Sequence, residues 1–130
     1  MLIEKKVYKN VDNEIMEKIK MYLEHLCENR FYNSFEVIVA LYELYNNGFK
    51  YSNKPVDIII KRYKSSIVIR VNDHGKGFNV KEKLNVSTCD LKKNIHKPCG
   101  RGIYIVKEFV SKIYYNKKGN QVVVKIKENK

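Results

Sequence analysis

Two adjacent apolar runs restrict the possible folds of this chain more than any other pattern. The segments 56–63 and 66–73 are rich in Ile and Val with alternation, and only Lys64 and Ser65 separate them. Alternation with a period of two is typical of half-buried strands, and a connection this short joins antiparallel neighbours. The sequence therefore predicts an antiparallel hairpin in the middle of the chain.

The segments before this hairpin predict two helices. The first is expected over residues 12–28, with Asp12 or Asn13 as its cap, because apolar residues recur there at spacings of four, three and four: Ile15, Ile19, Tyr22 and Leu26. The second is expected to start at Asn33 or Ser34 and to run to about residue 51.

The remaining segments complete an α+β pattern. A weak alternation predicts an edge strand at 2–8, and the K-K-G-N turn signal joins expected strands at 111–116 and 121–127. A long polar loop is expected at 79–99, and a third helix over 101–110. We therefore expect one domain, residues 1–130, with the α+β fold of a two-layer sandwich. Its mixed, mostly antiparallel sheet would be covered on one face by three helices.

The charge of the chain suggests an acidic partner without identifying one. Lys and Arg number 26 against 14 Asp and Glu, so the formal charge is +12. Nucleic acid, an anionic membrane surface or an acidic protein would all suit this excess. However, the basic residues are scattered through every segment, and a patch rather than a total marks a nucleic-acid-binding face. We therefore expect most lysines to be solvated surface residues and predict no direct nucleic-acid contact.

The cysteines and the apolar segments favour a cytoplasmic protein without a membrane contact. No segment approaches the roughly 20 apolar residues needed to span a bilayer, and the first ten residues lack a secretory signal's apolar core. Three cysteines in no paired spacing are expected to be reduced thiols. Cys89, His96 and Cys99 share one segment, and His74 could join them as a fourth zinc ligand, although structural zinc sites normally use two close ligand pairs.

Three short stretches carry the chemistry. They are E43-L-Y-N-N47-G-F-K50 on the second expected helix, D73-H-G75-K-G77-F78 after a strand, and G100-R101-G102 at the start of the third expected helix. Each of them alone could be an ordinary turn or a solvated helix face, since Gly, Asp and Asn gather in turns for backbone reasons. Their order and spacing together predict a nucleotide pocket.

The second expected helix has two faces. At 100° per residue, Asn47 and Lys50 lie within about 40° of Glu43, so the three polar residues share one face. An aromatic and apolar stripe lies elsewhere on the helix and is expected to face the sheet: Phe35, Ile38, Tyr42, Tyr45 and Phe49.

Asp73 and the glycine-rich helix start supply the two ends of the expected pocket. Asp73 follows Val71 on the inward face of its strand, and a buried carboxylate needs donors such as the exocyclic amine of adenine. Gly75 and Gly77 would let the backbone approach a flat ring. Gly100 and Gly102 bracket a helix start, where free N–H groups and the helix dipole favour an anion.

The three stretches resemble, in order and spacing, the N box, the D-x-G-x-G box and the G-x-G box of the GHKL ATPases. The resemblance covers nearly the whole chain, and it implies that superfamily's Bergerat fold, the histidine-kinase-like ATPase fold. The form E43-x-x-x-N47 is most similar to the bacterial anti-sigma-factor serine/threonine kinases. Those are stand-alone domains that bind ATP and Mg, grip a sigma factor and phosphorylate a serine of an antagonist, the anti-anti-sigma protein.

The resemblance also implies a role for each residue of the site. Glu43 would be the general base, Asn47 the Mg ligand, Lys50 a phosphate contact, and Asp73 the reader of the adenine amine. The glycines and their neighbours would shape the adenine pocket and hold the phosphates: Gly75, Gly77, Phe78, Gly100, Arg101 and Gly102.

Two residues depart from the anti-sigma pattern. Gly48 stands where the family usually has alanine, and Tyr51 where anti-sigma kinases commonly have histidine, so the stretch from Asn47 is closer to the N box of sensor histidine kinases. A detached histidine-kinase catalytic domain, and an ATP-binding module without phosphotransfer, are therefore alternatives. The resemblance further implies a homodimer, to which the edge strand at 2–8 could contribute.

Overall fold

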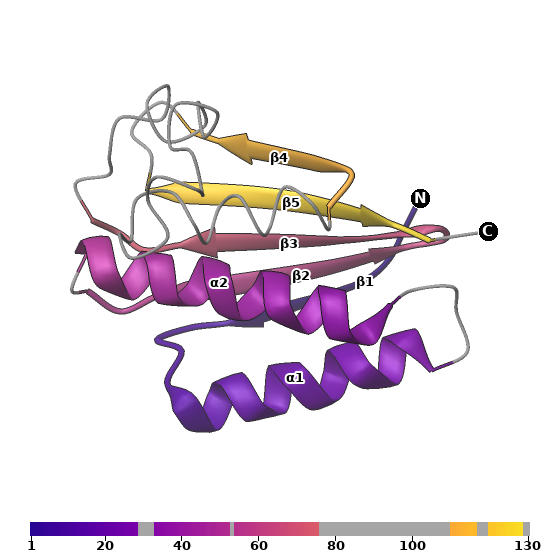
Figure 1. The fold of residues 1–130 in the computed structure, drawn as a ribbon, viewed down its shortest axis with the longest axis horizontal. Helices are drawn as coiled ribbons and strands as arrows, with labels where there is room; N and C mark the ends of the chain where they lie inside the picture. Colours follow the sequence, from indigo (N-terminus) through magenta and orange to yellow (C-terminus); the bar gives the residue numbers. More distant parts are fainter. Residues whose placement is uncertain (29–32, 53, 76–109, 117–119, 129–130) are drawn as a thin grey trace, which may run out of the picture.

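The computed structural model describes residues 1–28, 33–52, 54–75, 110–116 and 120–128, with only the backbone described for 47–52. These residues form two helices and five strands (Figure 1). In chain order the elements are β1 (Leu2–Tyr8), α1 (Asn13–Cys27), α2 (Ser34–Ser52), β2 (Asp57–Tyr63), β3 (Ser66–Asn72), β4 (Lys112–Tyr115) and β5 (Gln121–Lys127).

The strands form one sheet in the order β1-β2-β3-β5-β4. The expected hairpin is confirmed: β2 and β3 are antiparallel neighbours, with Ile60 opposite Ile69. β1 pairs with β2 and is an edge strand, as expected, while β5 pairs with both β3 and β4. All four of these pairings are antiparallel, so the described sheet is antiparallel throughout rather than mixed.

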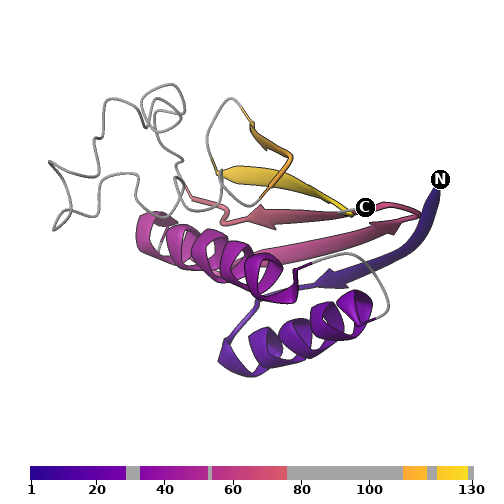
Figure 2. The ribbon, with the colours of Figure 1, turned by 45° about the vertical axis from the view of Figure 1, so that its right-hand side comes forward.

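Both described helices lie on the same face of the sheet (Figures 1 and 2). This arrangement confirms the two-layer α+β architecture with one covered face. The core between the layers is formed by alternate strand residues and by the inner faces of the helices, among them Ile58, Ile60, Ile67, Ile69, Val124, Ile19, Leu23, Leu41 and Leu44.

Each helix starts at a side chain that accepts a backbone N–H. The Asp12 carboxylate accepts the N–H of Ile15 at 2.8 Å, and the Asn33 side chain accepts the N–H of Glu36 at 3.2 Å. The first N–H groups of a helix have no partner within the helix, so such acceptors stabilise its first turn. Of the two caps considered for each helix, Asp12 and Asn33 are therefore the ones that the structure uses.

The expected sheet-facing stripe of α2 is only partly correct. Tyr45 is buried, and Ile38 and Tyr42 are half-buried, but 71% of Phe35 is exposed. The residues that pack in the core are instead Val37, Ala40, Leu41 and Leu44. The reason is that α2 packs against α1 as well as against β3, so its apolar residues are shared between two neighbours. Tyr42 lies near Glu17 and Lys20 of α1, and the Tyr45 hydroxyl donates to the carbonyl of Val11 at 3.0 Å.

The count of helices differs from the expectation. The described part of the chain has two helices rather than three, and the third was expected over 101–110, where only Val110 is described. The expected loop over 79–99 also lies outside the described residues. Neither described helix is both long enough and apolar enough to cross a membrane.

Candidate functional site

Asp73 lies at the end of β3, on the inner side of the sheet as the alternation predicts. Only 8% of it is exposed. Its carboxylate accepts the backbone N–H of Gly75 at 2.7 Å. Burial raises the pKa of Asp73 above its ordinary value, although the Gly75 N–H and the nearby His74 act in the opposite direction. The ionised carboxylate is therefore held in surroundings that disfavour its charge, and further donors would stabilise it.

The turn that follows Asp73 is fastened to the strand hairpin β4–β5. The backbone N–H of Asp73 donates to the carbonyl of Asn120 at 2.9 Å, and the Asn120 side-chain amide donates to the carbonyl of Gly75 at 3.0 Å. These two bonds join residues that are more than 40 positions apart. They hold the backbone on both sides of the Asp73 carboxylate in one conformation.

A second carboxylate, Asp57, supports the same turn from β2. It accepts the backbone N–H of Asn10 at 2.9 Å and lies 2.7 Å from the His74 Nε2. The Lys9 ammonium is 3.6 Å from the same carboxylate. His74 has a φ of 59°, in the left-handed region that is uncommon for residues other than glycine. The contact with Asp57 helps to stabilise this conformation between Asp73 and Gly75.

The predicted polar residues Glu43, Asn47 and Lys50 belong to α2. α2 packs against β3, and its C-terminal end lies at the same end of the sheet as the C-terminal end of β3 (Figures 1 and 2). Glu43 is half-buried on this helix. Asn47 and Lys50 follow within two helical turns, and the structure describes their backbone only.

The other predicted site residues lie outside the described part of the chain. They are Gly77, Phe78, Gly100, Arg101 and Gly102, together with the zinc candidates Cys89, His96 and Cys99. Within the described ranges, no three His, Cys, Asp or Glu residues are placed to hold a metal ion, and His74 contacts Asp57. Cys27 is a buried free thiol, as expected, and burial raises its pKa to about 11.

The sequence reasoning missed two residues that shape the site, Asp57 and Asn120. Asp57 had a signal in the sequence, because it is the single acid in the apolar run V-D-I-I-I. A carboxylate in such a run is costly to bury unless the folded protein supplies hydrogen-bond donors or a cation beside it. Asn120 belongs to the K-K-G-N turn and had no separate signal, since its contacts with Asp73 and Gly75 depend on the pairing of β3 with β5.

The geometry of Asp73 suits recognition of an amine on a flat ring. A carboxylate offers about four acceptor positions, so the Gly75 N–H leaves capacity for another donor. The exocyclic amine of adenine is such a donor and is neutral, and it would offset part of the cost of burying the charge. Gly75 has no side chain, so the backbone beside the carboxylate can approach a flat ring closely. The described residues therefore fit an adenine nucleotide.

Comparison with known proteins identifies the family. A family model described as the histidine kinase-like ATPase domain matches residues 12–126, from the N-cap of α1 into β5. No curated protein gives a significant match. The match spans most of the chain, and the matched range includes Glu43 and Asp73. The chain therefore belongs to the histidine kinase-like ATPase domain family, and it is an ATP-binding domain of the GHKL type.

Proposed function

We propose that this protein is a cytoplasmic, Mg-dependent serine-protein kinase that acts as an anti-sigma factor. It would bind a sigma factor and would phosphorylate a serine of an anti-anti-sigma protein. One observation carries the kinase part of the proposal: Glu43 lies one turn before Asn47 on the helix that packs against β3, the strand that presents Asp73. This arrangement supports a base beside the phosphates of a nucleotide whose adenine is held by Asp73.

The roles of the residues follow from their chemistry. Asp73 would accept the adenine amine, and Gly75 and the sequence neighbours Gly77 and Phe78 would border the ring. Asn47 would hold the Mg ion, which would supply positive charge to neutralise the phosphates. Lys50 and the segment Gly100, Arg101 and Gly102, where the sequence predicts a helix start, would also contact the phosphates, because N–H groups, an ammonium and a guanidinium favour anions.

Phosphotransfer then needs a base for the acceptor hydroxyl. Glu43 takes the proton of the acceptor serine as its oxygen forms a bond to the γ-phosphorus. The bond from that phosphorus to the β-phosphate oxygen breaks, and the products are phosphoserine and ADP. Glu43 is half-buried, so its carboxylate is accessible to a docked acceptor while it is held by the helix.

The proposal includes a homodimer. β1 is an edge strand of the described sheet, and its outer edge has backbone groups that can pair with another strand. A second copy of the chain could pair along this edge, and the sigma factor would bind the dimer.

Replacement of Glu43 tests the kinase. Wild-type protein is incubated with ATP, Mg and an acceptor of the anti-sigma antagonist type, and phosphoserine is measured by mass spectrometry. Glu43→Ala should bind ATP normally in calorimetry but should lose phosphotransfer by at least about 100-fold, the upper range for loss of a general base being about 10⁴-fold. Glu36→Ala is the matched control. It removes the same side chain from the same helix, about two turns earlier and within about 20° of the same face, and should leave transfer unchanged.

Two other outcomes would replace the serine-kinase proposal. Transfer to a histidine of a partner protein, with no labelled serine, would indicate a detached histidine-kinase catalytic domain, as the similarity of N47-G-F-K50-Y-S to that group's N box suggests. ATP binding with no labelled acceptor of either kind would indicate a regulatory ATP-binding module.

A further inference from the structure

The face of the sheet that the helices leave uncovered carries a row of lysines. The strand register places Lys5 opposite Lys61, Lys61 opposite Val68, Val68 opposite Lys125, and Lys125 opposite Lys112. Residues directly opposite each other share a face. Their immediate neighbours Ile60, Ile67, Ile69 and Val124 are buried in the core, so this row points away from the helices. At about 4.8 Å per strand the row spans roughly 19 Å.

This row is unfavourable for the isolated fold. Lys5 and Lys61 are like charges directly opposite each other, and so are Lys112 and Lys125. Such pairs destabilise a sheet by a few tenths of a kcal/mol or more each. A polyanion bound across the row would turn this repulsion into attraction.

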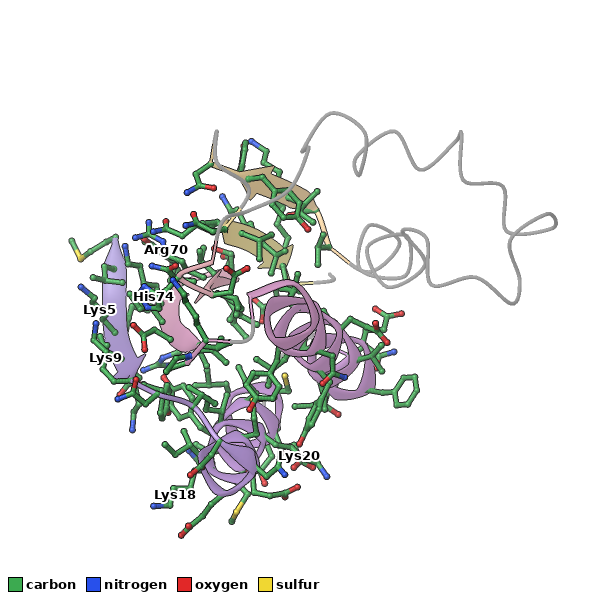
Figure 3. All side chains as sticks on the ribbon, turned by 90° about the vertical axis from the view of Figure 1, so that its left-hand side faces the viewer. Lys5, Lys9, Lys18, Lys20, Arg70 and His74 are labelled. Atoms are coloured by element: carbon green, nitrogen blue, oxygen red, sulfur yellow. The ribbon has the colours of Figure 1, made fainter. Side chains whose placement is uncertain are left out.

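The described strands place almost no acidic residues on the open face. Among the described strand residues that point away from the helices, Asp57 is the single acid, and His74 and Lys9 contact it. Arg70 lies one row from the lysines, opposite Ile59 and Val123. Figure 3 shows Lys5, Lys9, Arg70 and His74 on this side, and Lys18 and Lys20 on α1. The helical layer holds most of the acids in the described part of the chain: Asp12, Glu14, Glu17, Glu24, Glu28, Glu36 and Glu43.

A tyrosine lies on each side of the lysine row. Tyr114 is 55% exposed and belongs to the row of Arg70 and Val123. Tyr63 belongs to the row on the other side, where it is opposite Leu2. Two residues along a strand separate neighbouring rows by about 7 Å, so both rings are close to the lysines.

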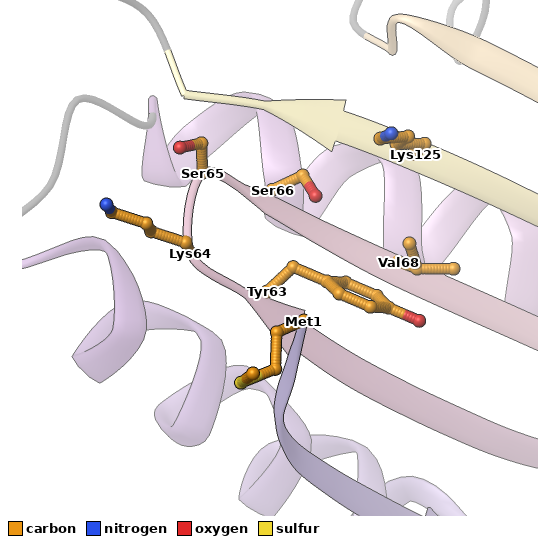
Figure 4. A pocket seen from close by; sticks show the side chains of 7 residues that line it. All are labelled: Met1, Tyr63, Lys64, Ser65, Ser66, Val68 and Lys125. Atoms are coloured by element: carbon orange, nitrogen blue, oxygen red, sulfur yellow. The ribbon is translucent and has the colours of Figure 1, made fainter.

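A hollow surrounds the Tyr63 ring. It has a volume of about 390 Å³ and is lined by Met1, Tyr63, Lys64, Ser65, Ser66, Val68 and Lys125. Figure 4 shows the ring lying along the sheet, with Met1 on one side and Val68 and Lys125 on the other. The hollow therefore combines an aromatic ring, hydroxyl groups and ammonium groups on one open surface.

We propose that this open face binds single-stranded nucleic acid, with the Lys5–Lys61–Lys125–Lys112 row along the phosphates and Tyr63 and Tyr114 stacked on bases. A basic surface with aromatic rings is how proteins bind single strands, and an antiparallel sheet is one platform for it. A single strand exposes its bases to the rings, whereas a duplex does not. Charge alone would also suit an acidic protein, but the two tyrosines, one on each side of the lysine row, favour a ligand with bases.

Fluorescence anisotropy with labelled 20-nucleotide oligo-dT and oligo-U tests this proposal, and both strands lack the adenine that the nucleotide site is proposed to recognise. The wild-type protein should bind, and its affinity should fall steeply with salt. Lys61→Glu with Lys125→Glu should lower affinity at least about tenfold and reduce the salt slope by about 1.4, since each phosphate contact contributes about 0.7. Lys18→Glu with Lys20→Glu is the control: it removes the same charge from α1 and should change affinity less than twofold.

Variants of Tyr63 distinguish binding of nucleic acid from binding of an acidic protein. Tyr63→Leu should weaken binding about fivefold or more, and Tyr63→Phe, which keeps the ring, should bind like wild type. Equal losses in the two lysine pairs would mean that net charge rather than this face attracts the strand, and would overturn the proposal. A second result would also overturn the proposal: poly-glutamate competes as strongly as oligo-U, and Tyr63→Leu binds like wild type. That result would assign the face to an acidic protein. Circular dichroism of each variant confirms that the fold is kept.

Discussion

Asp57 and Asp73 are both buried carboxylates beside the same turn, yet their surroundings shift their pKa values in opposite directions. For Asp73, burial prevails over the Gly75 N–H and His74, and its pKa is raised. For Asp57, burial alone would raise the pKa, but the Asn10 N–H, the His74 ring and Lys9 together lower it. Asp57 thus stabilises the fold as an anion, whereas the Asp73 anion is costly until a donor meets it.

Replacement of Asp57 by Asn should destabilise the protein in a pH-dependent way. A lowered pKa in the folded state means that the anion adds stability above the unfolded-state pKa, and that this stability is lost as pH falls through the folded-state pKa. We expect Asp57→Asn to lose about 1–3 kcal/mol of unfolding free energy at pH 7, the usual value of a hydrogen bond to a charged group. Urea unfolding at several pH values measures it.

The difference between wild type and Asp57→Asn should shrink as the pH falls below the ordinary carboxyl pKa and through the lowered folded-state pKa of Asp57, because the Asp57 side chain then becomes neutral. Glu14→Gln, an exposed carboxylate in the first turn of α1, is the control and should change stability by less than about 0.5 kcal/mol. A loss in Asp57→Asn that does not shrink at any acidic pH at which the protein stays folded would show that packing, rather than the charge, is responsible.

At the scale of elements, the two helices differ in how well their buried faces could be predicted. For α1, Ile19 and Leu26 are buried and Ile15 and Tyr22 are half-buried, so the predicted face is close to the real one. Tyr22 also donates to the Glu4 carboxylate and lies under the Lys6 ammonium, 4.7 Å from its ring centre, which ties α1 to β1. α2 packs against both α1 and β3, and helical periodicity does not indicate which of its apolar residues face which neighbour.

The N-cap of α1 gives a prediction at this scale. Asp12→Ala removes the acceptor of the Ile15 N–H and should lower the unfolding free energy by about 1 kcal/mol, whereas Asp12→Asn keeps an acceptor and should lose only a few tenths. Chemical denaturation monitored by circular dichroism measures both variants. Equal losses in the two would mean that the charge near the helix N-terminus, rather than the cap, carries the effect.

At the scale of the whole molecule, the described acidic and basic side chains lie mainly in different layers. The helical layer carries most of the described acids, and the open face of the sheet carries lysines and an arginine. The proposed nucleotide site, which includes Asp73 and Glu43, lies at one end of the interface between the layers, where α2 covers β3. The two proposed binding surfaces are therefore distinct, and each can be altered without the other.

ATP should stabilise the whole domain. A ligand at 100 times its dissociation constant adds about 2.7 kcal/mol, which for a domain of this size corresponds to a rise in Tm of roughly 10 °C. Differential scanning fluorimetry with ATP and Mg measures this shift. Asp73→Asn should bind ATP about 10–100-fold more weakly, because its amide presents a donor where the adenine amine needs an acceptor.

The same variant separates binding from folding. Since the pKa of Asp73 is raised in the folded state, its anion costs stability at pH values above that pKa. Without ATP, Asp73→Asn should therefore be as stable as wild type at pH 7, or more stable. A lower Tm for Asp73→Asn without ATP would mean that the carboxylate holds the fold together instead of serving a ligand.

The sequence by itself determined the local structure of this protein. Strand alternation, helical spacing and capping side chains act between residues a few positions apart, so the described strands, α1 and α2 could be predicted. The inward direction of Asp73 followed from the same alternation. The order and spacing of the motifs from Glu43 to Gly102 were also visible in the sequence, and the family match supports the GHKL resemblance that they suggested.

Only the tertiary structure decided which distant residues meet. Strand register decides three features: the contact between His74 and Asp57, the hydrogen bonds from Asn120 to the Asp73 turn, and the lysine row. The row gathers residues as far apart in sequence as Lys5 and Lys125, which are 120 positions apart. The lysines looked scattered along the chain because the distances between them in sequence say nothing about neighbours across a sheet. Cross-strand pairing gathers them on one face, and no local pattern encodes that pairing.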